Sequence, residues 1–440
     1  MVGIFKKGSA TDPANYRPIS LLQTCYKLYA RIIANRLAAG LDDRIRELQF
    51  GFRKGRSTSE AIYLVRRLQD LVDAKKYQVL YLMFLDWSKA FDKIRPPALH
   101  LALQRLGVPN HMCAVVKELV SNPLFEVILD DQISSCKEQK SGIRQGCTLS
   151  PLLFILLQTV LFYDVQTKYL AKHPLSVTPQ IPFFDIEFAD DTVLIARTRE
   201  HMQDLLWYVQ DEASKYNLHL NMDKTKLVLY NSDASIAFRD GSLVQQVSSI
   251  VYLGGLIDQT GKPGPEVRRR IGEARQVFQK LKRVWRHAGL SVRKKLRIYK
   301  ACVVSKLIYN LSTLWLTDSQ LNHVDSFHFR CLRAIANIPT TWGAMQQGIT
   351  RVSNHEVRMQ LRETLLSQEI RLHQLKLLGH IFRRPIRQPS RIVSYNRFLE
   401  PQILGGPFRA GVRRGNWTES VLALAMTIFN DHFLKGAKRH

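Results

Sequence analysis

The sequence predicts an α+β protein: an antiparallel sheet backed by helices, followed by a basic and mostly helical region. Up to about residue 260, short runs of β-branched and aromatic residues alternate with longer segments of helical periodicity. From the GKPGP turn at 261–265 onward, strand patterns become few, and Lys and Arg alternate with an apolar stripe. With 440 residues and a hydrophobic content of 45%, the chain is long enough for two or three domains, each with its own core.

The charge is divided unevenly along the chain. Residues 261–440 hold 33 Lys and Arg against 10 Asp and Glu, which leaves 31 against 27 of the chain's 64 and 37 for residues 1–260. The net charge of +27 is therefore split as +23 and +4. This asymmetry favours a polyanion, nucleic acid above all, lying against the second part. The alternative is a basic surface that only keeps the chain soluble.

The first elements follow from apolar spacing and from helix-end residues. Residues 20–40 carry apolar residues at helical spacing and end at Gly40, which predicts a capped helix. The continuous apolar run 78–86 predicts a buried strand that ends on Asp86. Residues 96–108 begin with Pro and have Gly near their end, as helices prefer.

A hairpin and a buried helix come next. FEVILDD, together with the following ISSCKEQKSGIRQ, predicts a hairpin over 125–145. The apolar run 149–165 contains Gln158 and Thr159 and falls short of the roughly 20 residues that a membrane span needs. We therefore predict a buried helix that begins at Ser150, and no membrane partner.

The segment IEFADDTVLIA, residues 186–196, predicts a strand, a tight turn and a second strand, with Asp190 and Asp191 in the connection. An amphipathic helix over 199–216 and a strand, KLVLY, at 226–230 follow. In the basic part, Gly289 divides two helical stretches. Near the end, GGPFRAGVRRGNW and KGAKRH predict a loop and a flexible end. We place domain boundaries near residues 260 and 345.

Three carboxylates, those of Asp86, Asp190 and Asp191, lie at strand ends or turns. If the two strands are neighbours, these acids converge and raise one another's pKa unless a cation neutralises them. Mg²⁺ accepts a few carboxylate oxygens and completes its shell with water and phosphate. Two such ions stabilise the attacking and leaving oxygens of a phosphoryl transfer. The alternative is a polar turn whose Asp side chains cap the backbone; Asp86 and the basic region favour the metal site.

The cysteines and histidines indicate no zinc site. Six cysteines are scattered without a CxxC pair, so neither a disulfide framework nor a zinc ribbon is indicated. His323, His328 and Cys331 fall close together on a predicted helix, where their spacing is explained more simply by one exposed and one core face than by a metal site. A reducing, intracellular location, either nucleus or cytoplasm, fits this pattern.

The tetrapeptide FADD at 188–191 resembles the [YF]xDD signature of reverse transcriptases, and six further segments occur in that family's order. They resemble those of non-LTR (LINE-type) retrotransposon polymerases from about residue 3 to 260, and more loosely to about 385. The six are NYRPISLLQTCYKLYARIIANRL, GFRKGRST, FLDWSKAFDKI, GIRQGCTLSPLLF, NMDKTKL and YLGGLI. The resemblance implies a right-hand polymerase, with fingers and palm in 1–260, a basic helical thumb in 261–345 and a C-terminal helical region in 346–440.

Carried over to this sequence, the resemblance implies a set of catalytic residues. Asp86 and Asp190 would be the principal ligands of two Mg²⁺ ions, with Asp191 as a supporting carboxylate and Mn²⁺ as an alternative ion. Lys224 in NMDKTK stands where the family places a lysine near the leaving pyrophosphate, as a proton donor. The alternative for Lys224 is a solvated lysine at a strand edge. Asp92 is expected to brace its turn and not to bind metal.

The same resemblance implies a nucleotide pocket. Phe91 matches the bulky gate that crowds a ribose 2′-OH, although a core Phe on a helix turn is the alternative. The guanidinium of Arg17 suits a triphosphate by bidentate geometry. A missing side chain at Gly146 would let backbone approach the substrate. The substrate-binding candidates are Lys6, Lys7, Arg17, Trp87, Phe91, Gln145 and Gly146.

Two further segments match template and primer contacts. Arg53 and Arg56, with Lys54 between them, are expected to contact the template. Tyr252, Leu253 and Gly254 resemble the turn that grips the primer end. The implied partners are an RNA template, a DNA primer or target DNA, and dNTPs; the sequence indicates no oligomeric state.

The sequence also departs from the family's pattern. Thr148 stands where the family commonly has Pro in QGCPLSP, and the chain opens at MVGIFKKG, almost on the first fingers motif, so we expect an N-terminally truncated copy that keeps the core acids. The predicted function is RNA-directed DNA polymerase, extending a primer 3′-OH with dNTPs by two-metal phosphoryl transfer. The alternatives are an inactive copy that only binds nucleic acid and an RNA-dependent RNA polymerase, which Phe91 disfavours.

Overall fold

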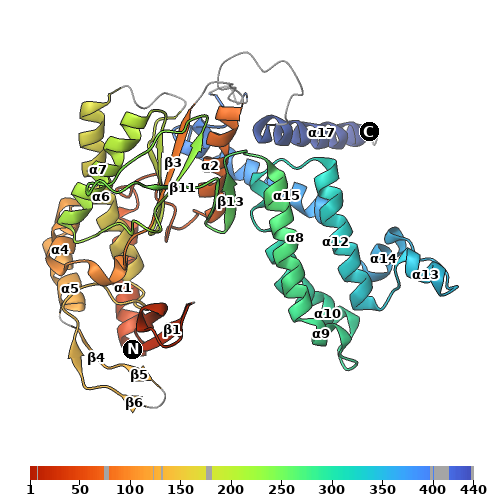
Figure 1. The fold of residues 1–440 in the computed structure, drawn as a ribbon, viewed down its shortest axis with the longest axis horizontal. Coiled ribbons are helices and arrows are strands. Elements are labelled where there is room, and N and C mark those ends of the chain that lie inside the picture. The colour runs from red at the N-terminus through yellow and green to blue at the C-terminus, as the bar shows by residue number, and fades with distance from the viewer. Residues whose placement is uncertain are drawn as a thin grey trace. The chain divides into compact units, whose positions relative to one another are not determined.

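The computed structural model describes residues 1–440 except 7, 74–78, 122, 130–131, 175–180, 397–399, 401–415 and 438–440 (Figure 1). The chain divides into two compact units: the first holds Met1–Ala61 and Tyr77–Ile250, and the second holds Ile62–Lys76 and Val251–His440. The fold is α+β, as the sequence predicted.

The central sheet of the first unit has the strand order β11-β10-β3-β9-β8 within the described residues. Neighbouring strands run antiparallel, apart from the parallel pair β10 and β11, which confirms the predicted antiparallel sheet. The strands are β3 (Leu80–Leu85), β8 (Asp185–Phe188), β9 (Asp191–Ala196), β10 (Lys226–Tyr230) and β11 (Gln245–Gln246).

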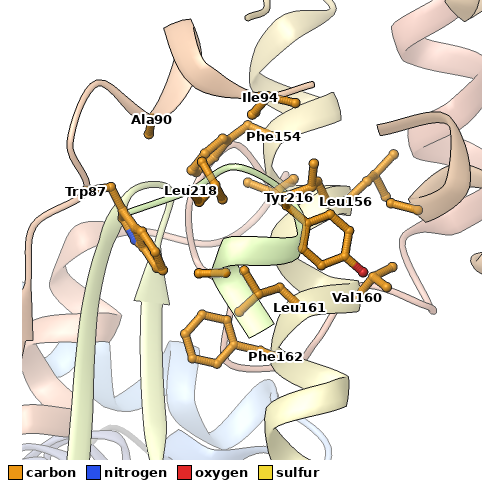
Figure 2. Packing of buried hydrophobic residues seen from close by; sticks show 14 of the residues in the cluster. Trp87, Ala90, Ile94, Phe154, Leu156, Val160, Leu161, Phe162, Tyr216 and Leu218 are labelled. Carbon is orange, nitrogen blue, oxygen red and sulfur yellow. The ribbon is translucent and has the colours of Figure 1, made fainter. Parts of the chain in front are cut away.

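The helix α6 (Ser150–Lys172) forms the centre of the core beside this sheet. It is apolar on nearly all sides. The predicted length was wrong, because the helix continues past residue 165 to Lys172 and is long and apolar enough to span a membrane. Most of it is buried inside the first unit, as predicted. Tyr81, Met83 and Leu85 alternate along β3 and pack in the same cluster as α6 and α7 (Arg199–Lys215). Figure 2 shows side chains of this cluster around Phe154 and Phe162.

The other elements of the first unit follow the sequence prediction closely. The helix predicted at 20–40 is α1, although Gly40 lies inside it and Asp42 is its C-cap. The helix predicted at 96–108 is α4, and the predicted hairpin forms through the antiparallel pairs β4–β7 and β5–β6. A second sheet has the order β2-β1-β5-β6. The helices are α1 (Thr24–Leu41), α3 (Ala90–Lys93), α4 (Pro96–Arg105) and α5 (Asn110–Val120), with a 3-10 turn at Pro13–Asn15. The strands are β1 (Val2–Phe5), β2 (Tyr16–Ile19), β4 (Leu124–Phe125), β5 (Ile128–Leu129), β6 (Gln132–Ile133) and β7 (Lys137–Glu138).

The second unit is almost entirely helical beyond one hairpin, and α2 (Thr58–Asp73) enters it from residue 62. Gly289 lies between α9 and α10, as predicted. The predicted loop lies outside the described residues up to 415. Of the end predicted to be flexible, 435–437 are helical in α17 and 438–440 lie outside the described residues. The strands are β12 (Ser249–Tyr252) and β13 (Gly255–Asp258). The helices are α8 (Pro263–Lys280), α9 (Lys282–Arg286), α10 (Val292–Tyr299), a π-helical stretch (Lys300–Val304), α11 (Ser305–Ile308), a 3-10 turn (Leu311–Thr313), α12 (Asp318–Ala336), α13 (Thr341–Gln346), α14 (Asn354–Leu361), α15 (Leu366–Arg383), α16 (Pro389–Ile392) and α17 (Trp417–Ala437).

The helix α12 carries the histidines and the cysteine that fall close together in the sequence. His323 is exposed, whereas His328 and Cys331 are buried. The His328 ring stacks on Tyr299, whose hydroxyl lies 2.9 Å from His328 Nδ1, and burial lowers the pKa of His328 to about 4. The predicted division into an exposed and a core face is confirmed.

Arg46 is the centre of a buried polar network in the first unit. Its guanidinium contacts Asp185 and donates to Glu187 Oε1 at 3.1 Å, to the Phe162 carbonyl at 3.1 Å and to Gln166 Oε1 at 2.8 Å. Burial, and then the charge of Asp185, raises the pKa of Glu187 well above its ordinary value. Arg46 therefore supplies the positive charge that two acids on the same face of β8 require.

We expect Arg46→Met to destabilise the first unit by about 3–5 kcal/mol, because it leaves Asp185 and Glu187 buried without a cation. The measurement is the free energy of unfolding in denaturant. Arg239→Met is the matched control: Arg239 pairs with Asp211 at the surface, so its loss should cost about 1 kcal/mol or less. Equal losses in the two variants would contradict this role of Arg46.

Candidate active site

The register of β3 and β9 brings the three predicted carboxylates to one end of the sheet. The strands are antiparallel, with Leu85 paired to Thr192. Asp86 directly follows β3, Asp191 opens β9, and Asp190 lies in the turn before it. The structure therefore places all three acids at the same end of two neighbouring strands.

The carboxylates at this end of the sheet repel one another. Burial of its carboxyl group, followed by the charges of Asp190 and Asp86, raises the pKa of Asp191 to about 6. Burial and the charge of Asp86 also raise the pKa of Asp190, while its own backbone and the charge of Arg17 act in the opposite direction. Both residues still reach solvent. Converging, accessible carboxylates of raised pKa are a donor set that fits a hard divalent cation.

The turn that carries Asp190 is held in an unusual backbone conformation. Phe188 pairs with Asp191, so Ala189 and Asp190 form a two-residue connection, and Ala189 has φ +54° in the left-handed region. Such a conformation costs a residue with a Cβ roughly 1–2 kcal/mol. The buried Ala189 N–H donates to Gln49 Oε1 at 2.8 Å, which satisfies it without water.

Gln49 was not recognised from the sequence as a site residue. Its side chain is buried, and its Nε2 donates to Gln158 Oε1 at 3.1 Å and to Glu187 Oε2 at 3.2 Å. Through Glu187 it joins the Arg46 network. The available signal was a lone polar residue in LQFGF, which says that Gln49 has a partner but not which one.

Lys224 lies beside Asp86. Its Nζ is 3.7 Å from Asp86 Oδ2, and its side chain is 64% exposed. The backbone of the same segment fixes Asp86: the Asn221 N–H donates to the Asp86 carbonyl at 2.7 Å, and the Asp86 N–H donates to Thr225 Oγ1 at 3.4 Å. Thr225, which is fully buried, is a second supporting residue that the sequence reasoning missed.

The RQG segment is tied to α3. Gln145 Nε2 donates to Asp92 Oδ1 at 2.8 Å, so Asp92 braces this segment. Gly146 has φ +111°, and a Cβ there would lie 2.7 Å from the Ser20 carbonyl oxygen. The backbone that approaches Gly146 is therefore that of Ser20, a contact that the sequence reasoning did not foresee.

The remaining nucleotide-pocket candidates differ in exposure. The half-buried Phe91 ring stacks on Phe154, with centroids 4.9 Å apart and planes 18° apart. Arg17 is exposed on β2, close enough to Asp190 for its charge to lower the pKa of that carboxyl. Lys6 is exposed after β1. The Trp87 indole is buried in the core (Figure 2), so a substrate contact of that side chain finds no support here.

One substrate candidate, Lys7, lies outside the described residues. The template candidates Arg53 and Arg56 have protein partners. Arg53 donates to Asp42 Oδ1 at 2.9 Å and to backbone carbonyls, while Arg56 lies 3.8 Å from Glu60 Oε1 and over the Phe50 ring. Lys54, between them, is exposed.

The predicted primer turn belongs to the second unit. Leu253 and Gly254 both have positive φ, +46° and +76°, and connect β12 to β13. The Tyr309 hydroxyl donates to the Leu253 carbonyl at 3.0 Å, and Arg269 donates to the Gly254 carbonyl at 2.7 Å. Arg270 contacts the same Gly254 carbonyl. Side chains from α8 and from the segment after α11 thus hold this turn.

A family model described as reverse transcriptase (RNA-dependent DNA polymerase) matches residues 4–257. The chain belongs to the reverse transcriptase family. This confirms the resemblance read from the motifs and gives the chain a reverse transcriptase domain of the non-LTR retrotransposon type.

This reverse transcriptase chain is similar to two proteins of Drosophila melanogaster. It is 25% identical to the probable RNA-directed DNA polymerase from transposon BS, covering 94% of this chain and 44% of that protein. It is 29% identical to the RNA-directed DNA polymerase from mobile element jockey, covering 77% of this chain and 37% of that protein. The chain thus spans less than half the length of these relatives.

Two solved polymerase structures are similar to this chain at low TM-scores. A telomerase from Candida tropicalis in complex with a fragment of telomeric RNA has a TM-score of 0.42 at 13% identity, covering 86% of this chain and 62% of that one. The insertion loop deletion mutant of the RNA-dependent RNA polymerase of a human picobirnavirus has a TM-score of 0.41 at 12% identity. The match covers 79% of this chain and 61% of that one.

We expect Asp191→Asn to stabilise the metal-free reverse transcriptase at pH 8 but not at pH 4. The folded-state pKa of Asp191 is raised to about 6 from 3.8, so the favourable contribution of its protonated form is lost as pH rises between these values. With divalent ions removed by a chelator, Asp191→Asn should melt about 2–4 °C higher than the unmodified chain at pH 8, allowing for solvent screening.

Asp240→Asn is the control with the opposite sign. Hydrogen bonds from Ser242 hold the pKa of Asp240 below its ordinary value, so its ionised form favours the folded state and the variant should melt lower at pH 8. A melting difference for Asp191→Asn that is the same at pH 8 and pH 4 would exclude the repulsion as its cause.

Proposed function

We propose that the chain is an RNA-directed DNA polymerase of a non-LTR retrotransposon that extends a primer 3′-OH with dNTPs on an RNA template. The observation that carries this proposal is the set of three converging carboxylates with Lys224 beside Asp86. The match to the reverse transcriptase family supports it independently. The reaction is a two-metal phosphoryl transfer in which positioning does most of the work.

Asp86 and Asp190 would hold the divalent ions, with Asp191 in support; Mg²⁺ is the expected ion and Mn²⁺ an alternative. When bound, such ions stabilise the attacking and leaving oxygens of the transfer. Lys224, solvated and 3.7 Å from Asp86, is the proton donor to the departing pyrophosphate. The exposed Arg17 is the ligand of the triphosphate, because guanidinium binds phosphate oxygens in pairs.

Phe91 would select deoxyribonucleotides. Its ring stacks on Phe154 of the core helix, which limits how far it can retreat from a sugar. Gln145, held by Asp92, would keep the neighbouring wall of the pocket in place. A rigid ring under the sugar excludes a 2′-OH by its volume, without a hydrogen bond of its own.

The basic helices of the second unit would be the thumb. Arg and Lys recur along α8, α9 and α10, and contacts from such side chains to phosphates hold a duplex without much sequence preference. The Tyr252–Gly254 turn would hold the primer end. The division into fingers and palm over 1–260, thumb over 261–345 and a C-terminal region over 346–440 is part of this proposal.

We expect the unmodified chain to extend a DNA primer on RNA in Mg²⁺, and Asp190→Asn to lower the rate by roughly a thousandfold or more, because a principal metal ligand is lost. Primer extension on a denaturing gel measures it. Asp233→Asn, at an exposed acid after β10, is the control and should extend normally. Robust DNA synthesis by Asp190→Asn would contradict the assignment of Asp190 as a metal ligand of the polymerase.

A second candidate function is nucleic-acid binding without synthesis. The excess of 33 Lys and Arg over 10 Asp and Glu in residues 261–440 favours it, because that charge binds phosphate whether or not the palm is active. Salt-sensitive RNA binding that is unchanged in Asp86→Asn, together with no extension by the unmodified chain, would establish it. Absence of binding at low salt would exclude both functions.

Replacing Phe91 tests the sugar gate. Phe91→Ala should raise the ratio of ribonucleotide to deoxyribonucleotide incorporation on the order of tenfold or more, since the steric block to the 2′-OH is removed. Phe91→Tyr keeps the ring and should keep the discrimination. Single-nucleotide extension kinetics with each substrate measure the ratio. Equal use of both substrates by the unmodified chain would point instead to an RNA polymerase.

A further inference from the structure

The side-chain amide of Gln49 lies directly under the turn that carries Asp190. We propose that Gln49 is a positioning residue that fixes the Ala189–Asp190 turn and so aims Asp190 and Asp191 at a divalent cation. This inference rests on the proposed function, because it concerns the same carboxylates. It assigns a role to a residue outside the recognised motif positions.

The hydrogen bonds determine which way the amide points. Gln49 Oε1 accepts from the N–H groups of Gly51 and Ala189, both at 2.8 Å, and backbone N–H groups can only donate. Nε2 must therefore face the oxygens of Gln158 and Glu187, at 3.1 and 3.2 Å. Each of the four hydrogen-bonding positions of the amide is used, which leaves this buried side chain a single orientation.

The turn needs this partner because its first residue is strained and buried. Ala189 has φ +54° and is 4% exposed, so its N–H has little access to water. A buried donor without an acceptor costs roughly 1–3 kcal/mol, in addition to the cost of the left-handed backbone. Without Gln49 Oε1, other conformations of the turn become more stable relative to this one. Each of them would point the carboxylates of Asp190 and Asp191 in a different direction.

The segment around Gln49 is itself fastened to β8. The Phe50 N–H donates to the Glu187 carbonyl at 2.8 Å, and the Glu187 N–H donates to the Leu48 carbonyl at 2.9 Å. Gly51 lets the segment lie against the turn, since a Cβ at that position would be 2.2 Å from the Ala189 nitrogen. The backbone around Gln49 is therefore fixed by hydrogen bonds to β8.

Gln158 provides a matched control in the same network. Like Gln49 it is fully buried, and it bonds Gln49 Nε2 through Oε1 and Thr192 Oγ1 through Nε2 at 3.3 Å. It makes no described hydrogen bond to the backbone of Ala189 or Asp190. Gln49→Met and Gln158→Met thus remove the same chemical group from the same network, but only the first removes a bond to the turn.

The experiment measures Mn²⁺ binding to the full chain without nucleotide, by the loss of the free-ion electron paramagnetic resonance signal. Asp190→Asn defines the binding that belongs to the carboxylates. We expect Gln49→Met to weaken that binding about tenfold, the size of one buried hydrogen bond, and Gln158→Met to change it less than threefold at a similar drop in melting temperature. The Mg²⁺ concentration for half-maximal primer extension should shift in the same order.

Equal weakening in the two Met variants, or unchanged binding in Gln49→Met, overturns the proposal. If Gln49→Met does not fold, Gly51→Ala takes its place, because the added Cβ displaces the turn while the amide stays; unchanged Mn²⁺ binding then overturns it. An unmodified chain that binds Mn²⁺ through Asp190 but extends no primer refutes the polymerase function alone. An unmodified chain without such binding refutes the positioning role.

Discussion

The site depends on the antiparallel register of β3 and β9. Because Leu85 pairs with Thr192, the residues that follow β3 and begin β9 are adjacent, and both are acids. Every residue of β3 is buried, so a slip of one position would turn the face of the strand that packs on α6 away from that helix. The apolar core thus fixes the register, and the register brings like charges together that would otherwise separate.

The segment DIEFADD uses its four acids in two opposite ways. Asp185 and Glu187 point to the same side of β8, are fully buried, and share the guanidinium of Arg46. Asp190 and Asp191 lie past the strand end, reach solvent, and raise one another's energy. The first pair shares the positive charge of Arg46 inside the protein, whereas the charge of Asp190 helps to raise the pKa of Asp191 in the second pair. Asp185 and Glu187 are two residues apart on β8, so their side chains lie on the same face of the strand, whereas Asp190 and Asp191 come after β8 has ended.

The strands, the core helix and the converging acids were predictable because apolar runs and turn residues are local signals. The partners of polar side chains were not. Gln49 is 140 positions from Ala189, and Arg46 is 141 from Glu187, so neither pairing leaves a local pattern. Arg53, a predicted template contact, bonds Asp42, the residue that follows α1, and the motif did not indicate this partner either. Trp87 follows Asp86 in the sequence, but its indole is buried in the core.

The Ala189 turn of the first unit and the Gly254 turn of the second unit are held by groups of different charge, and the difference has a physical reason. A neutral amide holds the Ala189 turn; an arginine there would attract the carboxylates and compete with a metal ion, whereas a carboxylate would add to their repulsion. Arginines hold the Gly254 turn, where a carbonyl must be bound and the proposed ligand is a polyanion. In each turn the supporting side chain satisfies the backbone without opposing the charge that the turn is proposed to handle.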